Sequence, residues 1–333
     1  MTTEYRGELL RAERKADWAF DPLPDPGNAG VGSAVTGTSF REDGKMTGAP
    51  RTEGAPVLFG GGIMEIYRGI TVSIAGSDSG GGAGIQADLK TCAALRVFGM
   101  TVITALTAQN SREVSAVWNV PREMIRAQMD ALWSDFPVGA AKTGMLALPE
   151  TILEVAEGIR RWKVGNLVVD PVMIAQSGAS LIADEAVEVL RTELLPLALL
   201  VTPNIPEAER LSGMTIESVE DMEKAAEAIG RKGPGAVLVK GGHRMQADSV
   251  TDVFYCRGRL ERFTDSRIHT ENTHGTGCTL SAAIAAELAS GSSLEEAVRR
   301  GRQYLRLALK SGFRPGTGWG PLGHAVTPPW TEK

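Results

Sequence analysis

From residue 70 onward the chain alternates short apolar strands with amphipathic helices, and this alternation constrains its fold more than any other feature. Strands that alternate with helices form a mostly parallel sheet covered on both faces, because a crossover must join each parallel pair. The pattern therefore predicts an α/β fold. We predict strands at 70–75, 100–106, 138–141, 166–170, 197–202 and 236–240, helices at 85–97, 121–136, 149–162, 184–195, 206–212, 219–232, 276–290 and 294–311, and a hairpin at 249–256 and 259–263.

Residues 1–65 differ from the rest in composition. The proline-rich stretch 21–30 and the Gly-, Ser- and Thr-rich run after it show no sustained periodicity. Such a segment cannot bury enough apolar surface to offset its ordering entropy. We expect residues 1–65 to be either a disordered N-terminal tail or a non-native extension with Met64 as the true start, before one domain at 66–333. The alternative is a targeting or regulatory arm, although its acidic residues are untypical of a transit peptide.

Charge and cysteine content limit the classes of partner. A net charge of -5 and a pI near 5.6 give no sign of a nucleic-acid-binding surface. Cys92, Cys256 and Cys278 show neither paired spacing nor a CxxC motif, which fits a reducing cytosol. No apolar run reaches the ~18 residues that a membrane span needs. We therefore expect a cytoplasmic protein with a small-molecule ligand.

The most informative short segment lies near the C-terminal end. Residues 272–278, here called the anion turn, read Asn-Thr-His-Gly-Thr-Gly-Cys and precede a small-residue run that predicts a helix. A helix start carries unpaired N–H donors and a partial positive charge, so it attracts anions. Cys278 stands in the first turn, where we expect the thiol to ionise more easily. The segment predicts phosphate chemistry.

Polar and glycine-rich residues gather directly after the predicted strands. In open α/β sheets, ligands bind beyond the carboxyl ends of the strands. We therefore expect these segments to share one crevice, with the anion turn at its edge. They are Gly76–Gly84, Gln109, Lys142–Met145, Asp170–Val172, Asn204–Glu207 and Lys240–His243.

On the early side of this crevice, each residue has two interpretations. Gly80–Gly84 lacks Walker A and Rossmann spacing, so its glycines serve either close helix–strand packing or a substrate-facing loop. Asp88 is either a solvated acid or an acceptor for an amino group or hydroxyl. Gln109 either caps a loop or offers a donor and an acceptor to a heterocycle edge.

The later side also leaves alternatives open. Asp170 is either a strand-end turn residue or an acid linked to a metal. Asn204 and Glu207 either cap the helix that begins near residue 206 or hold Mg²⁺ waters beside phosphates. Lys240 is either an exposed strand end or a cation near the phosphates of a nucleotide.

Taken together, these motifs resemble the hydroxymethylpyrimidine/phosphomethylpyrimidine kinases of thiamine biosynthesis, in the ribokinase-like superfamily. The similarity covers residues from about 70 to 330. It is carried by 75–91, 102–110, 142–146, 170–173, 202–208, 239–243 and the anion turn. The resemblance implies a three-layer α/β/α sandwich.

The resemblance also implies an activity, that of a transferase which uses ATP and Mg²⁺. Such a kinase phosphorylates the hydroxymethyl group of 4-amino-5-hydroxymethyl-2-methylpyrimidine and then converts the monophosphate to the diphosphate. The family further implies a homodimer.

By position, the resemblance assigns roles to the candidate residues. The pyrimidine pocket corresponds to Gly76, Asp88, Gln109, Met145 and Val172; Mg²⁺ and the phosphates to Asp170, Asn204 and Glu207; the nucleotide side to Lys240, with Asn204 and Thr276; and the anion hole and base to Gly275, Thr276, Gly277 and Cys278. Thr107 stands where an apolar residue is expected in this family.

Two other functions compete with this one. A pyridoxal kinase is possible because the same pocket can take another flat ring that bears a hydroxymethyl group; Gln109 and Met145 at the matched positions favour the pyrimidine. A non-catalytic pyrimidine-binding sensor is the third, and the retained Cys278 and paired glycines argue against it.

Overall fold

The computed structural model describes residues 66–173, 182–242 and 248–331. Our expectations for 1–65 and for His243 lie outside the described residues. Within them, nine strands form one sheet in the order β3-β2-β1-β4-β5-β6-β7-β8-β9, parallel from β2 to β7 and antiparallel at β3, β8 and β9. The strands are β1 Ile70–Asp78, β2 Phe98–Gln109, β3 Val114–Asn119, β4 Ala140–Thr143, β5 Leu167–Val169, β6 Leu200–Val201, β7 Ala236–Val239, β8 Ser249–Cys256 and β9 Arg259–Ser266.

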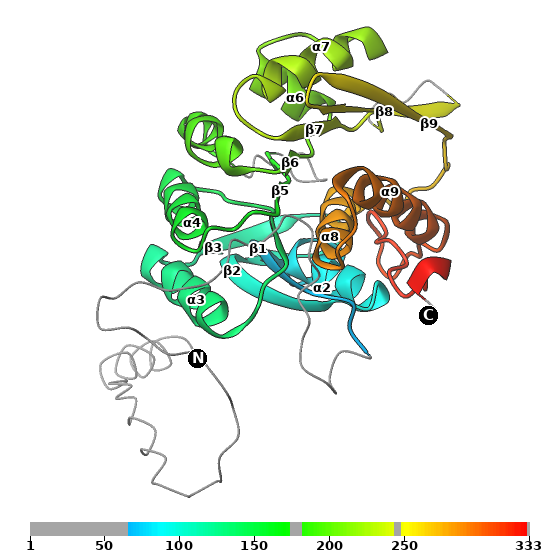
Figure 1. Cartoon of the computed structure of the whole chain (residues 1–333). Helices are drawn as coiled ribbons and strands as arrows, with labels where there is room; N and C mark the ends of the chain where they lie inside the picture. The colour runs from blue at the N-terminus through cyan, green and yellow to red at the C-terminus, as the bar shows by residue number, and fades with distance from the viewer. Residues whose placement is uncertain (1–65, 174–181, 243–247, 332–333) are drawn as a thin grey trace, which may run out of the picture. The chain divides into compact units, whose positions relative to one another are not determined.

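Helices cover both faces of this sheet, which confirms the predicted three-layer α/β/α class. Figure 1 shows α3 and α4 on one side of the sheet and α2 and α8 on the other. The helices are α2 Gly84–Ala94, α3 Arg122–Asp135, α4 Pro149–Arg161, α5 Asp184–Val189, α6 Ile205–Ser212, α7 Val219–Gly230, α8 Thr276–Ala289 and α9 Leu294–Lys310, with a 3-10 turn at Pro329–Thr331.

The alternation of side chains along each strand explains why apolar side chains are buried on both faces of the sheet. Leu167 and Val169 belong to the core that includes residues of α3, α4, α6 and α7, whereas Val168 belongs to the core under α8 and α9. Successive side chains of a strand point to opposite faces, so a wholly apolar strand feeds both layers. The uninterrupted apolar runs of the sequence are therefore the signature of a sheet buried on both sides.

Two elements differ from the sequence prediction. The strand β3 was not predicted. Its residues are largely exposed and lie at the sheet edge, so burial leaves no apolar pattern in its sequence. The helix predicted at 184–195 is interrupted: α5 gives way to a π-helical turn at Leu190–Leu194 and a 3-10 turn at Leu195–Leu197. Pro196 explains the ending, since its ring cannot continue an α-helix.

None of the helices in the described ranges is long and apolar enough to cross a membrane.

Candidate active site

The anion turn ends in a helix start that no side chain caps. Gly275 is the N-cap residue of α8 and has a φ of 86°, a left-handed conformation that favours glycine. A side chain at Gly275 would also collide with the carbonyl oxygen of Gly82. The sequence thus permits two backbone turns to touch, and it leaves the first N–H groups of α8 without a side-chain acceptor.

A buried ion pair lies against this helix start. Lys240 Nζ is 2.9 Å from Asp170 Oδ1, and the two side chains are 15% and 2% exposed. A Cβ atom on Gly277 would lie 3.2 Å from Asp170 Oδ2 and 3.4 Å from Lys240 Nζ. Thr202 Oγ1 donates to Asp170 Oδ1 at 3.2 Å. The structure therefore brings together the predicted anion hole, the predicted metal-side acid and the predicted nucleotide-side lysine.

Asn204 and Glu207 form the capping box that the sequence left open. The Glu207 N–H donates to Asn204 Oδ1 at 2.9 Å, and the Asn204 N–H donates to Glu207 Oε2 at 2.8 Å. Asn204 also bridges to Lys240 at the end of β7. Burial raises the pKa of Glu207 to about 7, and the Asp170 carboxylate adds to this while Lys240 opposes it. The capping role is confirmed, and the metal role remains a prediction.

These acids fit Mg²⁺ better than they fit a metal held by protein alone. In the described part of the chain, no group of three His, Cys, Asp or Glu side chains could hold a metal ion. Asp170 and Glu207 lie close enough for the charge of one to raise the pKa of the other. Mg²⁺ keeps several waters and is held by one or two carboxylates plus substrate phosphates. Two neighbouring acids beside an anion turn match that donor set.

Asp88 is not a solvated surface acid. It is 1% exposed, accepts a short hydrogen bond from Ser73 Oγ, and lies 3.0 and 3.2 Å from Lys142 Nζ through its two oxygens. Burial raises the pKa of Asp88 and on its own would lower that of Lys142, yet the Asp88 carboxylate raises the pKa of Lys142 above its usual value. The bidentate contact leads us to treat the two as an ion pair.

Cys278 lies among these charges, and our expectation for its thiol was wrong. Burial raises the pKa of Cys278 to about 11, although Lys142 and the Gly84 backbone N–H act in the opposite direction and Asp88 adds to the rise. We expected the helix start to favour the thiolate. The loss of hydration at the sulfur outweighs the helix effect, which the sequence pattern alone could not show.

The remaining pocket residues are positioned by backbone contacts. A Cβ atom on Gly76 would lie 3.2 Å from Met145 Sδ, so these two predicted pyrimidine contacts are neighbours. Thr104 Oγ1 donates to the Met145 carbonyl at 2.8 Å. Val172 follows Asp170 in a tight turn, with its N–H donating to the Asp170 carbonyl at 2.9 Å. Their contact with a pyrimidine remains a prediction.

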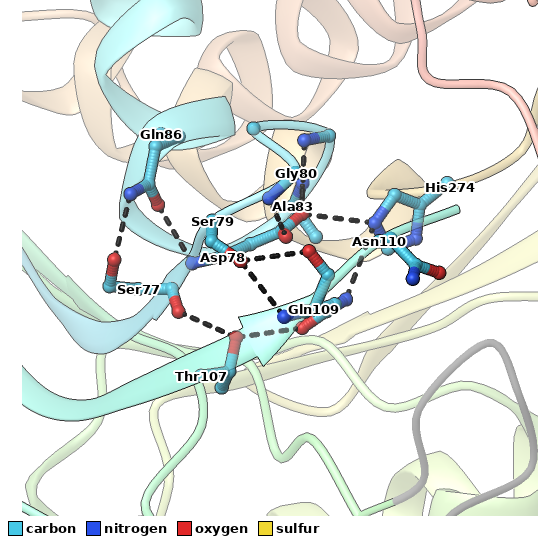
Figure 2. A network of polar contacts seen from close by, with 12 residues as sticks. Ser77, Asp78, Ser79, Gly80, Ala83, Gln86, Thr107, Gln109, Asn110 and His274 are labelled. Carbon is cyan, nitrogen blue, oxygen red and sulfur yellow. Dashed lines mark hydrogen bonds and ion pairs between the residues drawn. The ribbon is translucent and has the colours of Figure 1, made fainter. Parts of the chain in front are cut away.

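Gln109 belongs to a polar network that ties two loops together (Figure 2). Its backbone N–H donates to Ser79 Oγ at 2.8 Å, and its side-chain Nε2 lies 3.4 Å from His274 Nε2. Thr107 Oγ1 lies 3.2 Å from Gln109 Oε1, so the polar side chain at 107 has a partner within the fold.

Sequence reasoning gave no role to three residues of this region: Asp78, Lys142 and His274. A signal for Lys142 existed, because it directly follows the apolar run 138–141 and lies within the buried strand β4, where a charged side chain needs a partner. Asp78 and His274 gave no such signal, since their contact joins positions that are 196 residues apart.

Comparison with known proteins shows the family. A family model described as phosphomethylpyrimidine kinase matches residues 78–323. The chain belongs to this family. It is 54% identical over 258 residues to the hydroxymethylpyrimidine/phosphomethylpyrimidine kinase of Rhizobium meliloti, which covers 77% of this chain and 96% of the relative. It is also 50% identical over 259 residues to the thiamine biosynthesis bifunctional protein ThiED of Geobacter sulfurreducens. That match covers 78% of this chain but only 53% of the relative, so the chain spans about half the length of ThiED.

Solved structures of a pyridoxal kinase and of a phosphomethylpyrimidine kinase confirm the ribokinase-like fold. An ADP complex of Bacillus subtilis pyridoxal kinase matches with a TM-score of 0.72 and 38% identity, covering 78% of this chain and 98% of that one. The phosphomethylpyrimidine kinase of Clostridium difficile 630 matches with a TM-score of 0.64 and 44% identity, covering 71% of this chain and 97% of that one.

Proposed function

We propose that this chain phosphorylates the hydroxymethyl group of 4-amino-5-hydroxymethyl-2-methylpyrimidine with ATP, and then phosphorylates the monophosphate to the diphosphate, in thiamine diphosphate biosynthesis. The observation that carries the proposal is the contact of the uncapped α8 helix start with the Asp170–Lys240 pair. The names of the relatives supply the substrate class.

The substrate side is assigned to Gly76, Asp88, Gln109, Met145 and Val172. Asp88 enters this set in a different way from the others, because its carboxylate is already paired with Lys142. We therefore assign Asp88 to holding Lys142 in place beside the substrate side, here called the pocket floor, rather than to direct contact with the ring. The side-chain amide of Gln109 offers both a donor and an acceptor to the ring edge.

The nucleotide side is assigned to Lys240, Asn204 and Thr276, and the Mg²⁺ side to Asp170 and Glu207. A Mg²⁺ ion held there would neutralise charge on the phosphates while keeping several of its waters. Lys240 stands between the two acids in charge terms, since both raise its pKa against the effect of burial. The lysine therefore stays protonated and available to a phosphate oxygen.

Phosphoryl transfer needs positioning and charge stabilisation more than covalent catalysis. The backbone N–H groups of Gly275, Thr276, Gly277 and Cys278 are assigned to the charge that develops on the transferring phosphoryl group. Cys278 is assigned as the base that receives the proton of the substrate hydroxyl. Lys142 assists it, because its charge lowers the pKa of the Cys278 thiol.

The function is tested by measuring ADP release with the hydroxymethylpyrimidine, its monophosphate and pyridoxal as separate acceptors. Turnover of both pyrimidines supports the proposal. Turnover of pyridoxal with neither pyrimidine would favour the second function, which the similarity to Bacillus subtilis pyridoxal kinase keeps in view. Binding of the pyrimidine with no ADP release would identify a sensor instead.

Gly277→Ala should lower kcat about tenfold to 10²-fold, since the added methyl group displaces the anion turn from the Asp170–Lys240 pair. Alanine is intrinsically better in a helix by ~1 kcal/mol, so the thermal midpoint should not fall comparably. Steady-state kinetics and thermal melting check this. Gly165→Ala is the control, because a Cβ atom there meets nothing within 4 Å. Equal kcat in the two variants would contradict the assignment.

A homodimer, a cytoplasmic location and a kinase domain at 66–333 complete the proposal. Leu106 and Trp118 pair across β2 and β3 and are 42% and 65% exposed, and large exposed apolar side chains mark interaction surfaces. Light scattering tests the dimer, and a monomer mass would refute it.

The three free cysteines fit a reducing compartment, which cell fractionation tests. A chain that starts at Met64 should match the activity of the full chain.

A further inference from the structure

Asp78 has an unusual number of donors around one carboxylate. Its Oδ1 accepts the Gly80 N–H at 2.8 Å, and its Oδ2 accepts the N–H groups of Gly82 at 3.0 Å and Ala83 at 2.8 Å. Burial alone would raise the pKa of Asp78, but His274 and the backbone donors lower it below its usual value. The carboxylate is therefore ionised and organises the whole loop from 78 to 84, here called the glycine loop.

The fourth donor comes from the anion turn. His274 Nε2 lies 3.0 Å from Asp78 Oδ2, with the two side chains only 12% and 3% exposed. Because an ionised carboxylate only accepts hydrogen bonds, Nε2 must carry the proton in this contact. Figure 2 shows the His274 ring joined by dashed lines to Asp78 and to Gln109.

The two segments also touch through their backbones. A side chain at Gly82 would collide with the His274 ring, and one at Gly275 would collide with the Gly82 carbonyl. On its other side, the His274 N–H donates to the Gly320 carbonyl at 3.1 Å. His274 is thus held from both sides, next to the first glycine of the anion turn.

We infer that Asp78 and His274 are positioning residues that lock the glycine loop to the anion turn, so that the substrate-side and phosphate-side walls of the site keep a fixed separation. The pair touches neither the Asp170–Lys240 ion pair nor Cys278 in the described contacts. It acts on transfer by setting where the substrate hydroxyl and the phosphoryl group to be transferred lie relative to each other. This inference rests on the proposed function for its kinetic consequences only.

The kinetic test uses His274→Ala, His274→Gln and wild-type full-length chain. His274→Ala should lower kcat for the pyrimidine by about 10²-fold, the cost of a displacement near 1 Å, and raise the pyrimidine KM. The ATP KM should stay within about twofold, because the substitution does not change the residues assigned to ATP binding around Lys240. His274→Gln retains an N–H donor and should recover at least a third of the lost kcat on a logarithmic scale. Glu271→Gln is the matched control. Glu271 directly precedes the anion turn, and the substitution breaks only its exposed ion pair with Arg314.

A structural readout separates this inference from the proposed function. Hydrogen exchange of backbone amides should accelerate in His274→Ala at both 79–83 and 275–278, by about tenfold. Both segments should respond because the His274–Asp78 contact that joins them is lost. This holds whichever acceptor the enzyme uses. Acceleration in one segment only, or a kcat loss that glutamine does not relieve and that follows the loss of folded protein, would overturn the inference. Unchanged kinetics in His274→Ala would overturn it as well.

Discussion

Cys278→Ala should lower kcat for pyrimidine phosphorylation by about 10² to 10⁴-fold, the range for a lost general base. Its pKa of about 11 means that the thiol is protonated at neutral pH. Raising the pH increases the thiolate fraction about tenfold per unit below that pKa. The wild-type kcat should therefore rise with pH above neutrality, and the alanine variant should lose this rise. A pH series of initial rates with saturating ATP and pyrimidine measures both effects.

The control for this variant is Cys256→Ala, because Cys256 lies at the end of β8, in the hairpin. Its kcat and pH profile should match the wild type. If Cys278→Ala keeps kcat within about threefold and retains the pH-dependent rise, the thiol is not the base. The anion hole would then account for catalysis through its N–H groups alone, and the first turn of α8 would need only a small side chain at this position.

Sequence reasoning went furthest where the chain's periodicity reports burial. The apolar runs located β1, β5 and β7 because those strands are covered on both faces. It was silent at β3, whose exposed residues carry no such pattern. Apolar spacing also misled at the helix predicted at 184–195. Pro196, in the 3-10 turn that follows, cannot continue an α-helix whatever the spacing of the apolar residues before it.

The candidate site was predictable as a place but not as a set of contacts. Strand ends and a glycine-flanked helix start indicated one crevice, and the Asp170–Lys240 contact joins two of its members. The partner that caps with Glu207, Asn204, lies only three residues away, but whether Asp88 meets solvent depends on a partner distant in sequence. Asp88 and Lys142 are 54 residues apart, and no local pattern encodes their contact.

The glycine loop illustrates the same limit. Its sequence allowed either packing or approach of a flat ligand. The structure favours packing at two of its glycines: the space of a Gly82 side chain is filled by His274, and that of a Gly84 side chain lies near the Gly76 carbonyl, at 2.5 Å. Gly76, which lies within β1, has Met145 as its nearest neighbour, and its contact with a ligand stays a prediction.

Lys142→Met should destabilise the protein by about 3–5 kcal/mol, because it leaves the buried Asp88 carboxylate without its counter-charge. Denaturant unfolding followed by circular dichroism measures the change. Lys224→Met is the matched control, since Lys224 makes a 3.0 Å ion pair with Asp221 on the surface of α7 and is 64% exposed. That variant should unfold at nearly the wild-type midpoint, because solvent screens exposed pairs.

A second variant separates the structural effect of Lys142 from its effect on the thiol. Asp88→Asn combined with Lys142→Met removes both charges and keeps an acceptor for Ser73, so much of the lost stability should return. Kinase activity should stay low, because the positive charge that lowers the pKa of Cys278 is still missing. Recovery of stability and activity together would show that the pair serves folding alone. Recovery of neither would show that its geometry, rather than its charge balance, supports the pocket floor.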